Sequence, residues 1–260
     1  MIVGLFLMPL AQADQAAAAA PPAPSGLVFW LFLLAAMALA PFVLTMVTSF
    51  AKLVVVGGIL RHALGTQQIP PNTVITGLAL ILTIHIMSPV AMKIYGNYVR
   101  AEAAAATAPV ANQAAPSTTD IVRRSTVSAE GPMREFLERH SHPENVRMFE
   151  DLRDRLQATN RAEDAGALAD QADPLIRDLI YDLTVLTPAF MLSQLTEAFQ
   201  IGFLLFIPFL VIDLVVSNVL MAMGMQMMSP VTVSMPLKLL LFVLVDGWRL
   251  IMRGLVLGYT

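Results

Sequence analysis

The stretch MAMGMQMMSPV, from Met221 to Val231, carries unusual side-chain chemistry, because five of its first eight residues are methionine. A methionine side chain has three rotatable bonds and a polarisable thioether, so it adapts to irregular and changing surroundings. Helices built for stability favour Leu, Ile and Val, whose rotamers are better defined. The stretch is therefore either filler between two helix ends or a surface that must deform.

Charged residues inside apolar segments form the second chemically informative group. Asp213 and Asp246 each lie within a long apolar run, where a lipid-facing charge costs about 2.5–3.5 kcal/mol. We expect these carboxylates to face protein or water, and we group them with Arg249 and Lys52 as structural or proton-relaying charges. Arg249 follows Asp246 by three residues, which places both on one helix face and favours the structural role.

Signatures of other chemistry are missing from the sequence. It contains no G-x-x-x-x-G-K-[ST], H-E-x-x-H or G-x-S-x-G pattern and no cysteine, so neither a nucleotide site nor a common hydrolase site is indicated. His140 and His142 lie in a polar segment, and a solvated pair is the favoured interpretation over a metal site. We expect a protein that is not an enzyme and has no cofactor.

The composition predicts a membrane protein. Hydrophobic residues make up 57% of the 260, charged residues only 13%, and the mean hydropathy is +0.68, whereas soluble domains carry about a quarter charged residues. The net charge of −3 gives no indication of a nucleic-acid partner. Four apolar runs are long enough to cross a bilayer: Leu27–Val47, Thr73–Met92, Ile201–Met223 and Leu237–Tyr259.

The charges divide the chain into four predicted segments. Residues 101–180 hold 23 of the 35 charged residues, with a net charge of −5, and are expected to form a polar, α-helical insertion. Before it lie a signal-like leader with an Ala/Pro spacer, residues 1–25, and apolar helices with an amphipathic hairpin, residues 26–100. Residues 181–260 form C-terminal apolar helices with the Met-rich loop. The leader is open to two interpretations, a cleaved signal peptide or an uncleaved apolar N-terminus.

The distribution of basic residues predicts an orientation. The first hairpin carries Lys52 and Arg61 and no acidic residue, so it is expected to face the cytoplasm. The acidic insertion is then expected on the periplasmic side of a bacterial inner membrane that the chain crosses several times.

Three stretches resemble the FliP/SctR family of type III secretion export-gate proteins. PAFMLSQLTEAFQIGF, residues 188–203, and PLKLLLFVLVDGW, residues 236–248, are similar to the two signature blocks of the family. TSFAKLVVVGGILRHALGTQQIPPN, residues 48–72, is similar to its N-terminal block. The stretches VSNVLMAMGMQMMSP and LGTQQIPP are more similar to the injectisome branch, SctR, than to the flagellar branch, FliP.

The resemblance implies a fold, an assembly and partners. It implies an all-α membrane subunit whose kinked apolar hairpins assemble, in about five copies, into a helical cone that passes unfolded proteins. The implied partners are SctS/FliQ-like, SctT/FliR-like, SctU/FlhB-like and SctV/FlhA-like proteins. It also implies a methionine ring at the narrowest part of the pore, which corresponds here to Met225, Met227 and Met228, whereas Gln226 departs from an all-methionine run. Flexible thioethers are suited to closing an apolar constriction and repacking around a passing chain.

A secondary transporter is the alternative function. In that case Asp213 and Asp246 would be proton-coupling sites. Inverted repeats would support it, but the two apolar halves share no pattern.

Overall fold

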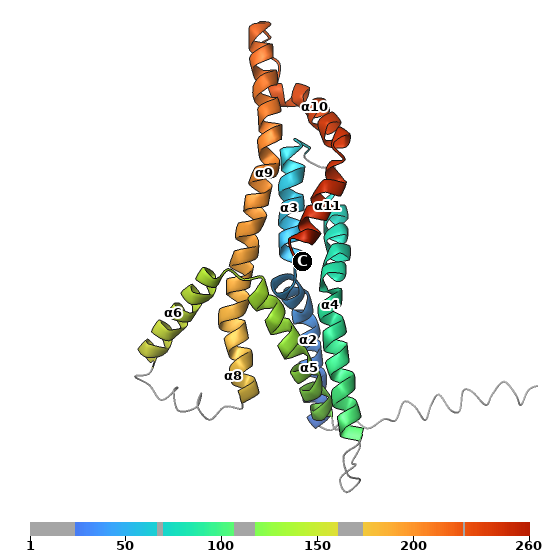
Figure 1. The fold of residues 1–260 in the computed structure, drawn as a ribbon, viewed down its shortest axis with the longest axis vertical. Coiled ribbons are helices and arrows are strands. Elements are labelled where there is room, and N and C mark those ends of the chain that lie inside the picture. The colour runs from blue at the N-terminus through green and yellow to red at the C-terminus, as the bar shows by residue number, and fades with distance from the viewer. Residues whose placement is uncertain (1–23, 67–69, 107–117, 161–173, 226) are drawn as a thin grey trace, which may run out of the picture. The chain divides into compact units, whose positions relative to one another are not determined.

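The computed structural model describes residues 24–66, 70–106, 118–160, 174–225 and 227–260, and within these ranges every regular element is a helix. The predicted all-α fold is therefore confirmed for the described part of the chain. In chain order (Figure 1) the elements are α2 (Pro24–Val47), α3 (Phe50–Ala63), α4 (Asn72–Ala106), α5 (Thr118–Arg139), α6 (Pro143–Asn160), α8 (Pro174–Tyr181), the π-helix η2 (Asp182–Leu186), α9 (Thr187–Ala222), α10 (Pro230–Leu244) and α11 (Gly247–Leu257).

The chain separates into two compact units, residues 1–44 and residues 45–260. Most of α2 belongs to the first unit, and all the other helices form the second. In the second unit α3 is central, because it packs against both α9 and α4. Its buried residues recur at helical spacing and are Lys52, Leu53, Val56, Leu60 and Ala63. The four-segment division of the sequence remains a prediction, and α8, η2 and α9 follow one another without a break.

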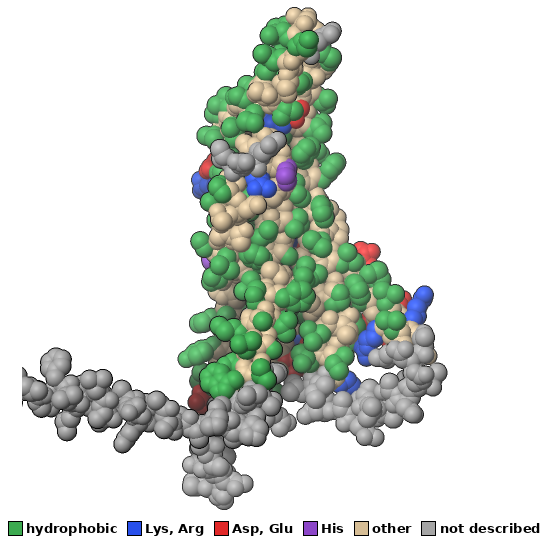
Figure 2. Space-filling view, turned by 180° about the vertical axis from the view of Figure 1, so that it is seen from behind, with side chains coloured by type: hydrophobic (Ala, Val, Ile, Leu, Met, Phe, Trp, Pro, Cys, Tyr) green, Lys and Arg blue, Asp and Glu red, His purple; other side chains and the backbone are tan. Residues whose placement is uncertain are grey.

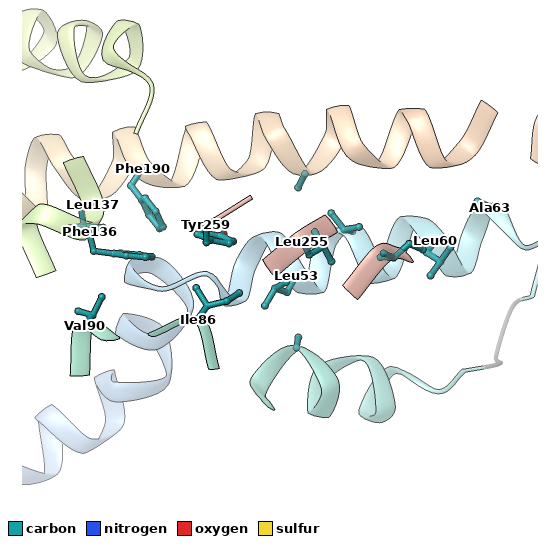
Figure 3. Packing of buried hydrophobic residues seen from close by; sticks show 14 of the residues in the cluster. Leu53, Leu60, Ala63, Ile86, Val90, Phe136, Leu137, Phe190, Leu255 and Tyr259 are labelled. Atoms are coloured by element: carbon teal, nitrogen blue, oxygen red, sulfur yellow. The ribbon is translucent and has the colours of Figure 1, made fainter. Parts of the chain in front are cut away.

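An aromatic cluster joins the polar insertion to the apolar helices. Phe136 of α5 lies 5.7 Å, between ring centroids, from Phe190 of α9 and stacks on Tyr259 at 6.2 Å. Figure 3 shows Tyr259 between these two rings and the aliphatic side chains Leu53 and Leu255. Aromatic pairs at such distances contribute about 0.5–1.5 kcal/mol beyond the burial of their area. The insertion therefore shares the core of the apolar helices at this point.

Prolines inside the helices leave carbonyl groups that need other partners. Pro89 cannot bond to the carbonyl of His85, and the Ser88 hydroxyl donates to that oxygen instead at 2.8 Å. In α5 the corresponding carbonyl is that of Ser128, four residues before Pro132, and it accepts a hydrogen bond from Asn97 on the neighbouring helix α4 at 3.5 Å. Side chains thus satisfy backbone oxygens that would be costly to leave bare in an apolar environment.

The π-helix has a comparable origin. Pro188 lacks the N–H that would bond to the carbonyl of Thr184, so the α-helical pattern cannot continue through it. The N–H and the hydroxyl of Thr187 both bond to the carbonyl of Asp182, five residues earlier, which is the π-helical pattern and spans one residue more than the α-helical bond. The long helix α9 therefore begins where the hydrogen-bond pattern shifts by one residue, and Pro188, its second residue, causes this shift.

The fourth predicted apolar run is not one helix. The structure breaks Leu237–Tyr259 at Val245 and Asp246, so the prediction of a fourth spanning helix is wrong. Two helices in the described residues are long and apolar enough to cross a membrane, Asn72–Ala104 and Arg177–Ala222. The first contains the second predicted run, and the second contains all of the third run except Met223. The broken pair Pro41–Val47 and Phe50–Ala63 would be a third if it counts as one span.

Apolar side chains remain exposed over much of the second unit. Figure 2 shows hydrophobic side chains across most of the visible face of the described residues. On α9 the exposed ones include Phe199, Phe203, Leu204, Leu210 and Leu214, and the α9–α10 hairpin encloses an apolar groove between Val215 and Leu240. Soluble monomers rarely expose so much contiguous apolar surface. These faces require lipid or other protein chains to cover them.

A close contact between α3 and α9 gives a test of the packing. A Cβ at Gly202 would lie 2.9 Å from Ile59 Cγ2 and 3.2 Å from Ile59 Cβ, whereas a Cβ at Gly77 on α4 would meet nothing within 4 Å. Gly202→Ala should therefore lower the thermal unfolding midpoint in detergent. Gly77→Ala should leave it unchanged or raise it, because alanine favours a helix by about 0.5–1 kcal/mol. Equal midpoints for the two variants would contradict this helix packing.

Candidate functional site

The Met-rich loop is the tip of the α9–α10 hairpin. The helix α9 ends in a Schellman motif, in which the N–H of Met225 bonds to the carbonyl of Leu220 at 2.9 Å and that of Gly224 to Met221 at 3.0 Å. Gly224 adopts a φ of +74°, a conformation that other residues disfavour. On the far side Pro230 starts α10, where its missing N–H costs nothing. The sequence thus fixes both ends of the loop.

The methionines of this loop have no core to fill within the single chain. Met227 is completely exposed, and Met225 and Met228 are 42% and 47% exposed. Met221 and Met223, at the end of α9, are exposed as well. Gln226 lies outside the described residues. Whether the three later methionines line a pore depends on neighbouring chains, so their role stays a prediction.

Asp213 lies in a polar clamp that connects three helices. Its carboxylate accepts hydrogen bonds from Lys238 Nζ at 2.7 Å and from Ser234 Oγ at 2.5 Å, both on α10. Lys238 is only 3% exposed and also donates to the carbonyl of Ala63 at the end of α3, at 3.3 Å. The clamp therefore holds the α9–α10 hairpin, and with it the methionine tip, against α3.

Asp246 is in a different environment. It precedes α11 with a φ of +52°, and its side chain is 66% exposed. Arg249 lies on the same face, 3.8 Å away and 81% exposed, so the predicted proximity of the two residues is present. An exposed pair of this kind contributes little to stability. Asp213 and Asp246 belong to separate polar groups, and no contact between them appears among the described residues.

Sequence reasoning missed a second polar cluster, centred on Glu197. Lys52, 2% exposed, forms an ion pair with Glu197 and lies 4.6 Å above the ring of Tyr259. The other oxygen of Glu197 is 3.0 Å from His142 Nε2 at the turn between α5 and α6. Lys52 is consequently a buried structural cation and not a charge on a water-facing hairpin, which corrects its role in the predicted orientation.

Neighbouring residues of α9 extend this cluster. Gln194 accepts a hydrogen bond from the Tyr259 hydroxyl and donates to the carbonyl of His140 at 2.9 Å. Ser193 accepts from the backbone N–H of His142 and from Asn145 Nδ2, each at 2.8 Å. Burial raises the pKa of Tyr259, so its hydroxyl remains a neutral donor. One face of α9 thus receives the start of α3, the α5–α6 turn and the C-terminal turn.

The two histidines of the insertion are not a solvated pair, so that interpretation is wrong. His140 and His142 are both partly buried. The Nδ1 atom of His140 lies 2.8 Å from the carbonyl oxygen of Phe136, in the last turn of α5. No group of three or more candidate metal ligands lies together in the described residues.

The single sequence signal for the Glu197 cluster was an acid at the start of an apolar run, with basic residues elsewhere in the chain.

Comparison with known proteins places this geometry in a family. The FliP family model matches residues 33–255. The chain is 40% identical over 229 residues to Yop proteins translocation protein R of Yersinia pestis, covering 88% of this chain and 94% of that one. It is 41% identical to hypersensitivity response secretion protein HrcR of Ralstonia nicotianae, covering 86% and 93% of the two chains.

A flagellar relative is similar to the same degree. Flagellar biosynthetic protein FliP of Pectobacterium carotovorum is 39% identical over 263 residues, covering 98% of this chain and 90% of that one. The residues that the family model matches include Lys52, His142 and Glu197, the Asp213 clamp and the methionine tip, whereas Tyr259 lies beyond them. The chain therefore belongs to the FliP family.

Proposed function

We propose that this protein is a core export-gate subunit of a type III secretion system, which passes unfolded proteins across the bacterial inner membrane. The observation that carries the proposal is about 40% identity, over nearly the whole chain, to proteins named for translocation and secretion. Similar identity to a flagellar protein leaves both branches of the family open. We favour the injectisome branch on the residues of the Met-rich loop.

The fold supports a role in an assembly. Its apolar helix faces are exposed in the single chain. We propose that about five copies form a ring in which other copies and SctS/FliQ-like and SctT/FliR-like subunits cover these faces. SctU/FlhB-like and SctV/FlhA-like proteins are the further partners that we propose. In such a ring each hairpin tip would contribute Met225, Met227 and Met228 to one constriction. Unbranched thioethers would close it when idle and repack around a passing chain.

The transporter alternative finds no support. The names of the relatives contain nothing in its favour. Asp213 already has Lys238 and Ser234 as partners, and Asp246 lies in a separate exposed pair. A coupling site would need these acids to act together or to change partners.

Deleting the gene tests the proposed function. Loss of needle and effector proteins from the medium, with restoration by a plasmid copy, would support an injectisome subunit. Loss of motility and of filament protein would assign the flagellar branch. Unchanged secretion and motility, in cells that normally make the protein, would contradict both.

The orientation is also a proposal. We place the acidic insertion, residues 101–180, in the periplasm because it follows the next apolar run after a hairpin that carries basic and no acidic residues, and such a hairpin favours the cytoplasmic side. Of the two hairpin cations only Arg61 still supports the cytoplasmic side, because Lys52 is buried. A periplasmic reporter fused at Glu144, which is exposed, should be active. An inactive reporter on a stably inserted fusion would reverse the orientation.

A further inference from the structure

The helix α6 lacks the buried anchor that its neighbour α5 possesses. Phe136 and Leu137 of α5 are 6% and 2% exposed and belong to the core. In α6, by contrast, none of the described side chains is buried, and only Val146 packs against the core from its edge. A helix with so little buried apolar surface has a low local free energy of opening.

The apolar stripe of α6 points away from the rest of the unit. Met148, Leu152 and Leu156 follow one another at intervals of four residues, so they share one helix face. Their exposed fractions are 41%, 45% and 65%. Among the described side chains of α6, the partly buried apolar ones are Val146 and Phe149. The other contacts on the side that faces the rest of the unit are polar.

Two polar clasps hold α6 in place. The first is at its start, where His142 contacts Glu197, and both the His142 N–H and Asn145 Nδ2 donate to Ser193. The second is at mid-helix, where Glu150 accepts a hydrogen bond from the Tyr181 hydroxyl at 2.6 Å and Arg153 lies 5.2 Å over the same ring. Water can replace each of these contacts, so their net contribution is small compared with core burial.

The chain supplies a pivot beside the first clasp. The helix α5 ends at Arg139, and α6 begins only at Pro143, which lacks the N–H needed to continue a helix. We infer that α6 is a detachable arm, which pivots about residues 140–143 and is held on α9 and Tyr181 by the two polar clasps, while α5 stays anchored. Opening exposes the face of α9 that carries Ser193 and Glu197. This inference does not depend on the proposed function.

Cysteine labelling of the full-length protein tests the arm, because the natural sequence contains no cysteine. Ser193→Cys places a thiol within the first clasp, at a position that is 0% exposed, and its sulfur is a weaker acceptor for the two donors that bond to Ser193. Ser128→Cys places a matched thiol in α5, where Ser128 is 5% exposed. Each reporter is combined with His142→Ala/Asn145→Ala, which removes both side-chain contacts of the first clasp, leaves only the backbone N–H of residue 142 to bond to position 193, and keeps the Lys52–Glu197 pair. Arg147→Ala, an exposed change on the same helix, is the control.

The clasp variant should raise the maleimide labelling rate at Cys-substituted position 193 by about ten- to hundredfold, as expected for the loss of hydrogen bonds that include a charged partner. Labelling at position 128 should stay slow in every background, and Arg147→Ala should change neither rate. An unchanged rate at 193 would overturn the inference, since α6 would then be held by other contacts. A parallel rise at 128 would also overturn it, because the whole insertion would be opening.

A distance measurement leaves Ser193 in place and covers the case in which its replacement disturbs folding. Spin labels at Leu156 and Phe199, exposed residues of α6 and α9, should show one distance in the unmodified background. The same labels should show a broader, longer distribution with His142→Ala/Asn145→Ala. A distribution that the clasp variant does not alter would again contradict a detachable arm.

Discussion

Asp213→Asn should destabilise this protein far more than the same change at Asp246. Removing the carboxylate of Asp213 leaves the Lys238 ammonium, which is 3% exposed, without an anion. Breaking one side of a buried pair costs about 3–5 kcal/mol, and we expect the lower end because Asp213 is 33% exposed. Asp246 is 66% exposed, and asparagine tolerates its left-handed backbone, so its replacement should cost less than about 1 kcal/mol. Thermal unfolding of the purified protein in detergent measures both.

A second substitution separates the structural role from a proton-relaying one. Lys238→Met removes the stranded ammonium and keeps a side chain of similar length, so Asp213→Asn/Lys238→Met should recover much of the lost stability. Export should recover with it if the pair only positions the hairpin. A stable double variant whose export no longer responds to the proton gradient would instead establish Asp213 as a relay.

Replacing Met225, Met227 and Met228 together by alanine should make the inner membrane leak without unfolding the subunit. These side chains are 42–103% exposed in the single chain, so each change should alter the free energy of unfolding by no more than about 0.5 kcal/mol. In a ring of several copies, however, every shortened side chain widens the constriction once per copy. We expect increased small-solute uptake or conductance in cells that contain normal amounts of the assembled complex.

The neighbouring methionines provide the control. Met221 and Met223 are also exposed, at 58% and 59%, but they precede Gly224, the glycine with a positive φ that follows the end of α9. Met221→Ala/Met223→Ala should leave the membrane tight. A triple variant that fails to assemble would favour the filler interpretation. An assembled triple variant as tight as the natural protein would show that these residues are not the seal.

Hydropathy located the apolar parts of α4 and α9, because a long apolar run indicates a spanning helix. It did not give their lengths, since α4 continues to Ala106 and α9 begins at Thr187, well outside the predicted runs. It failed at Asp246, since an average over Leu237–Tyr259 hides a single turn. The Asp246–Gly247 pair was the available signal, because Asp-Gly often marks a turn. A close approach of Gly247 to the Phe242 ring adds a tertiary reason for the break.

The sequence identified Asp213 as a buried charge but could not name its partner, and it misplaced Lys52. Lys52 and Glu197 are 145 residues apart, so their pairing depends on how α3 packs on α9. Counting charges along the sequence treated Lys52 as an exposed cation of the first hairpin. It could not detect that the side chain is buried, because burial is a property of the whole fold. The proposed methionine ring is still harder to predict from a single sequence, since it depends on several chains.

Crosslinking from the hairpin tip to a substrate in transit tests the export pore most directly. A photoactivatable residue in place of Met227, which is fully exposed, is combined with a secreted protein fused to a domain that cannot unfold and therefore stalls. The account predicts a crosslink between position 227 and the stalled chain, and none from the same residue at Leu156 on α6. An assembled, stalled complex in which position 227 never reaches the substrate would contradict it.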